Sequence, residues 1–237
     1  MHVFYTPHPE MGYTLNQEES EHAVRVLRMK AGDVAHLADG RGSLYEILIK
    51  SPDARSCGYE IRNKIKSEPE NSCKLSVAIA LTKQAERMEW FVEKAVEIGV
   101  SAIHFIVSVR TERSKINLAR IHKIAVSAMK QSTNLWLPVF SGPITFAEFI
   151  AKDANEQKYI AHLEDENRKL FSSALIPNKT ATILIGPEGD FSAEEISKAK
   201  NKEYVPVSLG NNRLRTETAG IMACAIAAMK RMERTNS

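Results

Sequence analysis

The sequence predicts an α/β protein in which a large domain built on a parallel sheet follows a small, mostly β unit. Short strand-like runs fill the chain up to about residue 68. From residue 75 onward, apolar runs alternate with segments of helical periodicity, a pattern typical of strands that helices cover on both faces. Between these parts lies the polar, proline-containing segment 68–72, which indicates a boundary between domains 1–70 and 71–237.

The small unit has four strand-like runs, at residues 3–5, 34–38, 44–49 and 58–61. Its helix is expected over residues 18–29, with Ala23, Val26 and Leu27 on the apolar stripe. The segment Asp39-Gly40-Arg41-Gly42 separates two of the strands and has the composition of a hairpin turn.

The large domain has five strand-like runs, at residues 75–81, 102–107, 159–163, 181–185 and 204–209. Helices are expected over 86–98, over 117–132, from Ser192 onward and over 216–231. Gly99 suits a left-handed helix cap, and Ser192 with Glu195 forms a capping box. The last helix is so rich in small residues that it can pack closely against a neighbour, either in the core or at a subunit interface.

Composition excludes several classes of protein. The three cysteines are widely spaced and the seven histidines are scattered, so we expect neither a disulfide framework nor a metal site. No apolar run is long enough to span a bilayer and no signal peptide is apparent, which predicts a cytoplasmic location. The net charge of +3 does not by itself indicate a nucleic-acid partner, and each basic cluster taken alone is best interpreted as a solvated face.

Two strands of the large domain each end in a polar loop that contains glycine and leads into a helix. The first loop is Ile185-Gly186-Pro187-Glu188-Gly189, and the second runs from Leu209 to Ala219. Because parallel strands place such loops at one edge of the sheet, we expect the two to converge on a ligand. Taken alone, the glycines serve equally well in a tight strand-to-helix turn.

The first loop matches neither the G-x-G-x-x-G pattern nor the phosphate-binding loop of nucleotide hydrolases. The carboxylates of Glu188 in this loop and of Asp190 directly after it would repel a pyrophosphate. An anionic loop favours a cationic or zwitterionic ligand, so it suits S-adenosylmethionine better than ATP or NAD.

The second loop presents two arginines, Arg213 and Arg215, ahead of a helix whose first turn contains Glu217. Guanidinium groups bind phosphates in pairs of hydrogen bonds and stack on bases, which suits an RNA substrate. The alternative is that these arginines form ion pairs with Glu188, Asp190 or Glu217.

Five segments in chain order carry a family resemblance: residues 22–28 with 32–33, residues 87–89 with 93–100, Gln131-Ser132 with Pro138, residues 185–189, and residues 214–219. With these segments the chain resembles the RsmE-type 16S ribosomal RNA uridine N3-methyltransferases of the SPOUT superfamily, over essentially its whole length. The resemblance implies a small PUA-like β-barrel domain that helps to hold RNA. It also implies a SPOUT-type α/β domain with a trefoil knot, and a homodimer.

The resemblance assigns the cofactor S-adenosylmethionine to the knot. The positions that carry over to its pocket are His162, Leu163, Ile185, Gly186, Pro187, Glu188, Gly189, Leu209, Gly210 and Leu214. The chain departs from the family pattern in three places. It has Asp190 where many relatives have a second glycine, Asn212-Arg213 in place of an Arg-Ile pair, and Lys130 and Asn134 in place of a glutamate and an arginine.

The implied reaction is transfer of a methyl group to N3 of a uracil in 16S ribosomal RNA or the small ribosomal subunit. Arg215 is the candidate for stabilising the uracil anion, and Glu217 for accepting the N3 proton, although a capping role for Glu217 fits equally. Since N3 lies on the pairing edge, the base must be unpaired or turned out of its stack.

Phosphate contacts are expected from basic residues of both domains: Arg25, Arg28, Lys30, Lys83, Arg113 and Arg213. Two other functions remain open. One is a non-catalytic RNA-binding or ribosome-assembly factor on the same fold, which would have no need of two cofactor loops. The other is a nucleotide-dependent enzyme on a Rossmann-like sheet, which the missing phosphate pattern disfavours.

Overall fold

The computed structural model describes residues 2–67, 74–164 and 168–235. Two compact units can be distinguished, one made of residues 1–70 with 126–137 and the other of residues 71–125 with 138–237. The predicted boundary segment 68–72 lies outside the described residues. Residues 126–137 group with the small unit because they bond to it: the Gly42 amide donates to the Leu135 carbonyl at 2.8 Å, and the Leu137 amide to the Gly40 carbonyl at 2.9 Å.

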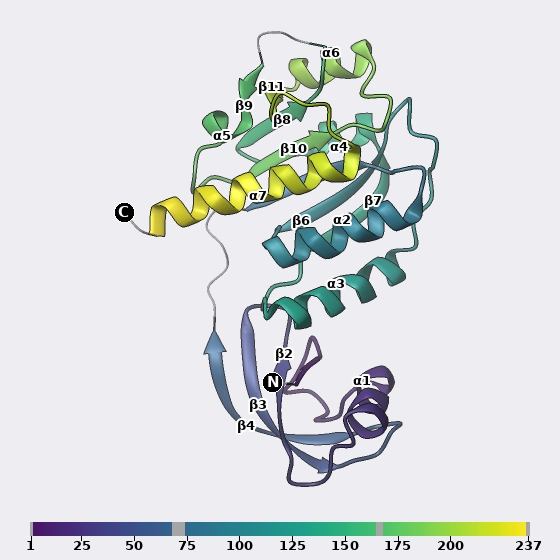
Figure 1. Ribbon diagram of the computed structural model, residues 1–237, viewed down its shortest axis with the longest axis vertical. Coiled ribbons are helices and arrows are strands. Elements are labelled where there is room, and N and C mark those ends of the chain that lie inside the picture. Colours follow the sequence, from purple (N-terminus) through teal and green to yellow (C-terminus); the bar gives the residue numbers. More distant parts are fainter. Residues whose placement is uncertain (1, 68–73, 165–167, 236–237) are drawn as a thin grey trace. The chain divides into compact units, whose positions relative to one another are not determined.

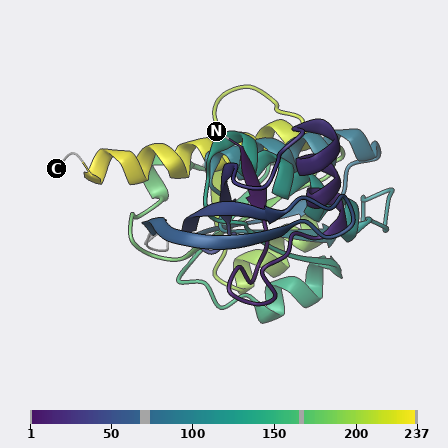
Figure 2. The ribbon, with the colours of Figure 1, turned by 90° about the horizontal axis from the view of Figure 1, so that it is seen from below.

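The described strands of the small unit form one sheet in the order β1-β2-β3-β4, with β1 (Val3–Tyr5) parallel to β2 (Val34–Ala38) and the other pairs antiparallel. Strands β3 (Ser43–Ser51) and β4 (Gly58–Ser67) run side by side as a long curved pair in both Figure 1 and Figure 2. The predicted hairpin turn is confirmed, because one Asp39 carboxylate oxygen accepts from the Arg41 and Ser43 amides. Closure into a barrel stays a prediction.

The helix expected over 18–29 is confirmed in its first part, but it ends at Val26 and only its first turn is α-helical. The α-helix α1 (Gln17–Glu21), whose Asn16 cap accepts from the Glu19 amide, gives way to a π-helix, η1 (His22–Val26). The wider π turn rotates the chain, so Ala23 stays buried while Val26 is 67% exposed and leaves the expected apolar stripe.

The large unit contains a parallel sheet whose described strands follow the order β7-β6-β5-β10-β8-β11-β9. The strands are β5 (Leu75–Ala80), β6 (Ala102–Val107), β7 (Val139–Thr145), β8 (Gln157–Ala161), β9 (Lys169–Leu170), β10 (Ala181–Ile185) and β11 (Val205–Ser208). The predicted α/β class is thereby confirmed. The sequence did not predict β7 and β9, because a Gly-Pro pair interrupts one and the other has only two residues.

Helices cover both faces of this sheet (Figure 1). The remaining helices are α2 (Ala85–Ile98), α3 (Leu118–Ser132), α4 (Phe146–Lys152), α5 (Phe171–Ala174), α6 (Ala193–Asn201) and α7 (Thr216–Thr235). Helices α4 and α6 pack on Ala78 and Ala80 of β5, while Ile79, which points to the opposite face, lies under α7. Both predicted caps are confirmed, since Gly99 has φ 90° and Ser192 and Glu195 bond reciprocally.

The small residues of α7 let it pack closely inside the core. A Cβ atom at Gly220 would lie 2.5 Å from a ring carbon of the fully buried Phe91 of α2. Ala223, Cys224 and Ala227 are buried on the same helix, so the core interpretation of this segment holds. None of the described helices is both long and apolar enough to cross a lipid bilayer. The knotted path of the chain stays a prediction.

Candidate active site

A cavity of about 350 Å³ opens at the carboxyl ends of β8, β10 and β11. Three segments line it: Ala161 to Leu163 after β8, Ile185 to Glu188 after β10, and Val207 to Gly210 after β11. Residues Asn212 to Thr216 of the second loop also line the cavity, together with Arg87, Arg168, Asp190 and Ala219. The two glycine loops therefore meet at one hollow, as expected from strands that end at one edge of a parallel sheet.

Three side chains, two from the second loop and one from the segment after β6, hold the backbone of the first loop. The Thr216 hydroxyl donates to the Gly186 carbonyl at 2.9 Å, and the Arg110 guanidinium donates to the Gly189 carbonyl at 2.7 Å. Arg213 reaches the Glu188 carbonyl at 3.3 Å. The loop is thus fixed in shape before any ligand arrives, which lowers the ordering cost of binding.

Asp190 connects two of the segments that line the cavity. Its backbone has φ 62°, the left-handed region that favours glycine. One carboxylate oxygen accepts from the Leu163 amide at 2.9 Å and the other from the Phe191 amide at 2.7 Å. The departure from the family pattern at this position therefore has a structural role, because the carboxylate ties the β8 loop to the β10 loop.

Glycines leave parts of the cavity wall without side chains. A Cβ atom at Gly186 would lie 3.2 Å from a carboxylate oxygen of Asp190, tighter than an ordinary contact. Gly210 has φ 134°, and the space where its Cβ would stand is open. The wall at Gly210 is therefore bare backbone, which lets a ligand approach closely.

The buried carboxylate of Glu217 and the exposed carboxylate of Glu188 share one cation, Arg87 of α2. The Arg87 guanidinium lies 3.8 Å from a carboxylate oxygen of Glu217 and 3.9 Å from one of Glu188. Glu217 is only 6% exposed, and its second carboxylate oxygen, Oε2, has no hydrogen-bond partner in the part of the chain that the structure describes. A buried acceptor without a partner is costly, so such an oxygen indicates a site for a ligand's donor.

The proposed pairing of Arg213 and Arg215 with these carboxylates is wrong. Arg213 bonds to a backbone carbonyl, and the exposed side chain of Arg215 makes no ion pair or hydrogen bond among the described residues. Sequence reasoning gave Arg87 no role, although Arg87 belongs to a segment that carried the resemblance. Only the packing of α2 against α7 brings it opposite Glu217.

Nine of the ten residues expected at the cofactor pocket line the cavity. They are His162, Leu163, Ile185, Gly186, Pro187, Glu188, Leu209, Gly210 and Leu214. Gly189 is the exception, because it lies against the Arg110 side chain. A Cβ atom at Gly189 would be 3.4 Å from the Cδ atom of Arg110. Sequence reasoning missed other lining residues, among them Arg87, Arg168 and Ser208, and it used Asp190 only as a charge beside the ligand.

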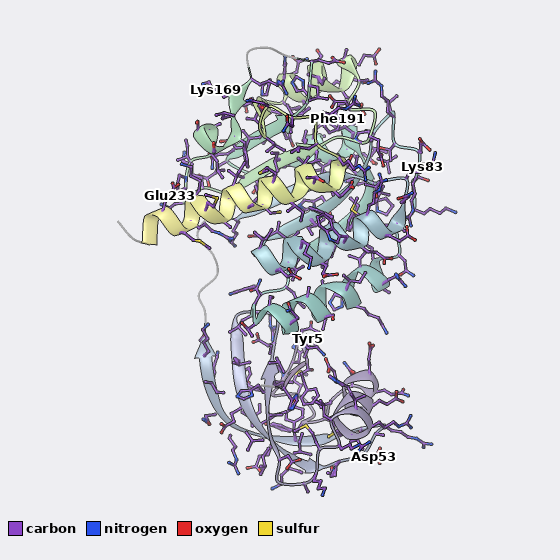
Figure 3. All side chains as sticks on the ribbon, viewed as in Figure 1. Tyr5, Asp53, Lys83, Lys169, Phe191 and Glu233 are labelled. Atoms are coloured by element: carbon purple, nitrogen blue, oxygen red, sulfur yellow. The ribbon has the colours of Figure 1, made fainter. Side chains whose placement is uncertain are left out.

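The basic residues expected to contact RNA lie in both units. Arg25, Arg28 and Lys30 are exposed around η1 of the small unit. In the large unit, Lys83 lies at the surface near the start of α2 (Figure 3) and forms an ion pair with Glu112 at 2.9 Å. The ion pair with Glu112 partly neutralises the charge of Lys83. Arg213 lines the cavity.

The cavity has the features that S-adenosylmethionine requires. Its wall has two glycines. Its rim carries two kinds of charge, the guanidinium groups of Arg87, Arg168 and Arg213 and the carboxylates of Glu188 and Asp190. The cofactor carries a sulfonium, an ammonium and a carboxylate, so both signs of charge on the rim have a counterpart on it. The residues present fit the group.

Comparisons with known proteins agree with this geometry. Residues 69–228 match the family model described as an RNA methyltransferase domain, and residues 15–57 match an RNA methyltransferase PUA domain. The ribosomal RNA small subunit methyltransferase E of Synechocystis is 30% identical over 222 residues, which cover 91% of this chain and 72% of that protein.

Two solved structures are similar over nearly the whole chain. A probable rRNA-methyltransferase from Porphyromonas gingivalis is 40% identical with a TM-score of 0.92, covering 99% of this chain and 100% of that one. The ribosomal RNA small subunit methyltransferase E from Neisseria gonorrhoeae, bound to S-adenosyl methionine, is 26% identical with a TM-score of 0.83, covering 98% of each chain.

Proposed function

Because the chain belongs to the ribosomal RNA small subunit methyltransferase E family, we propose that it methylates N3 of a uridine in 16S ribosomal RNA with S-adenosylmethionine as the methyl donor. One observation carries the proposal. A cavity of about 350 Å³ with a partly glycine wall lies beside the buried Glu217 carboxylate, and Arg87 and Arg215 border both.

The bound cofactor would supply an electrophilic methyl group on a sulfonium. The residues that would hold it are those of the glycine loops, with Gly186 and Gly210 allowing close approach and Leu163, Leu209 and Leu214 supplying apolar contact. The Asp190 carboxylate would act indirectly, by keeping the two loops together.

N3 of uracil is a poor nucleophile while it carries its proton, so the protein must remove that proton as the new N–C bond forms and the sulfur–methyl bond breaks. Glu217 would accept the proton, since its Oε2 has no partner among the described residues and is shielded from water. The exposed guanidinium of Arg215 would stabilise the negative charge that develops on the uracil carbonyl oxygens.

We assign residues 1–70 as a PUA-like RNA-binding domain and residues 71–237 as a SPOUT methyltransferase domain with a trefoil knot. The matched ranges 15–57 and 69–228 support the division. Arg25, Arg28 and Lys30 would contact phosphates of the RNA. We also propose a homodimer, which the exposed Met222 and Met229 of α7 would suit, and a cytoplasmic location, where ribosomal RNA is available.

The test is transfer of labelled methyl groups to small ribosomal subunits from a strain that lacks the modification, followed by nucleoside analysis. We expect N3-methyluridine with the wild-type chain, and a fall in turnover of about 10²- to 10⁴-fold for Glu217→Gln. Arg215→Ala should lose methylation while calorimetry shows unchanged cofactor affinity.

The matched control is Glu203→Gln, which removes an exposed carboxylate outside both cavities. It should methylate as the wild type does. Absence of label with the wild-type chain would contradict the proposal and favour a non-catalytic RNA-binding factor, whereas a fully active Arg215→Ala would contradict the role of that residue.

A further inference from the structure

A second cavity of about 350 Å³ lies between α2 and the start of α7. Glu86, Arg87 and Trp90 line it from α2, and Arg215, Glu217 and Thr218 line it from the other side. Trp90 lies four positions after Glu86 and three after Arg87, which places it beside both of them on the helix surface. Neither the family matches nor the cofactor assigns a role to this cavity.

The two cavities share a wall. Arg87 and Arg215 line both of them. Arg87 also spans the boundary, because its guanidinium lies close to Glu188 of the first cavity and to Glu217 of the second. A group held in the second cavity would therefore lie next to the first, across side chains that line both, and a transfer reaction needs such proximity.

We propose that the second cavity is the binding site for the uracil ring of the target nucleotide, with Trp90 as the surface on which the ring stacks. The inference rests on the proposed function and adds the site and the recognition of the acceptor base. Trp90 is 44% exposed although it is a large aromatic residue. Unpaired bases stack on such rings in proteins that bind single-stranded RNA.

The lining of the cavity complements the edge of uracil. N3 of uracil carries a proton and needs a hydrogen-bond acceptor. Glu217 Oε2 is a buried acceptor to which no donor among the described residues bonds. The carbonyl oxygens on either side of N3 need donors, and Arg215 offers an exposed guanidinium. Cytosine has no proton on N3, so it would leave the Glu217 oxygen without a partner and would be rejected.

Arg87 acts in this site as a positioning residue. Its guanidinium neutralises the Glu217 carboxylate from one side, which fixes the direction in which Oε2 points. Arg87→Lys keeps the charge but loses the planar fork. We therefore expect this variant to bind the cofactor normally and to discriminate less sharply between uridine and cytidine nucleotides.

The first experiment compares Trp90→Ala and Trp90→Phe with the wild type in methyl transfer to small subunits that lack the modification. Loss of one stacked contact should lower kcat/KM of Trp90→Ala by about 5- to 150-fold. Trp90→Phe keeps an aromatic face and should methylate at close to the wild-type rate. Calorimetry should show unchanged cofactor affinity for both.

The second experiment needs no turnover. The chain has two tryptophans, so Trp136→Phe leaves Trp90 as the only indole. With S-adenosylhomocysteine bound, uridine monophosphate should quench the Trp90 fluorescence and cytidine monophosphate should do so less at equal concentration. Glu217→Gln should remove that difference, because an amide can donate to N3 of cytosine as well as accept from N3 of uracil.

The outcomes separate the two proposals. Wild-type activity together with full activity of Trp90→Ala, or equal quenching by the two nucleotides, overturns the base site and leaves the methyltransferase assignment intact. No transfer by the wild type contradicts the proposed function itself. Light scattering covers the remaining outcome: if Trp90→Ala lowers both the molar mass and the activity, Trp90 belongs to a contact between copies of the chain and the base site is rejected.

Discussion

Replacing Asp190 should reveal how strongly its carboxylate ties the two cofactor loops together. The side chain accepts from the Leu163 amide at 2.9 Å and from the Phe191 amide at 2.7 Å. Hydrogen bonds to a charged group contribute about 1.5–3 kcal/mol each. Because solvent reaches the Leu163 bond, we take the lower limit for each, which gives a loss of about 3 kcal/mol when both are removed.

The backbone at Asp190 adds a second contribution that must be subtracted. At φ 62° the chain is in the left-handed region, where a residue with a Cβ atom is less stable than glycine by about 1–2 kcal/mol. Asp190→Gly therefore loses the bonds but gains relief from this strain, whereas Asp190→Ala loses the bonds and stays strained. We expect the alanine variant to be the less stable of the two.

Glu203 is the matched control for this comparison. It is an exposed carboxylate with φ 66°, and its side chain makes no hydrogen bond among the described residues. The difference in unfolding free energy between the glycine variants at positions 190 and 203 should isolate the two bonds at about 3 kcal/mol. The difference between alanine and glycine should be the same at both positions.

Urea unfolding followed by circular dichroism measures these differences, and calorimetry with S-adenosylmethionine measures their effect on the site. Without the bridge, the loop at Leu163 must be ordered by the ligand, so we expect cofactor binding by Asp190→Gly to weaken about 2- to 10-fold. Equal destabilisation by Asp190→Gly and Glu203→Gly would refute the reasoning, because the bridge would then contribute nothing to stability.

Three further predictions concern side chains outside the cavities. Lys130 donates to both carboxylate oxygens of the buried Glu19, at 2.7 and 2.9 Å. Lys130→Met should therefore lower the unfolding free energy by about 3 kcal/mol, and Lys130→Arg should lower it much less. Equal stability of the two variants in urea unfolding would contradict this prediction. Hydrogen bonding from Arg120 holds the pKa of Glu89 below its ordinary value; the stabilisation is present above the unfolded-state pKa and is lost as pH falls through the lower folded-state pKa. Arg120→Gln should therefore differ from the wild type in urea midpoint at neutral pH but not in strong acid, and a difference independent of pH would exclude the pair as its cause. Burial raises the pKa of the Cys224 thiol to about 12, so iodoacetamide should label it at mildly alkaline pH only after unfolding, and rapid labelling of the native chain, mapped by mass spectrometry, would contradict that burial.

Most elements of the large domain could be predicted because they carry a local signal, whereas β7, β9 and the short helices α4 and α5 were not predicted. Apolar runs at β5 and β10 indicate buried strands, and Gly99 and Ser192 indicate where helices end and begin. The helix near residue 22 was predicted, but its change to a π-helix could not be. Its residues have helical propensity, but propensity does not distinguish an α turn from a π turn.

The sequence by itself determined the α/β class, the two glycine loops and most of the backbone that lines the first cavity, because these depend on patterns within a few consecutive residues. Only the tertiary structure decided which side chains meet. Arg87 pairs with Glu217 because α2 packs against α7, and Asp190 bonds to the Leu163 amide because β10 lies beside β8 in the sheet. That order is set by packing between faces distant in the chain, which no local pattern encodes.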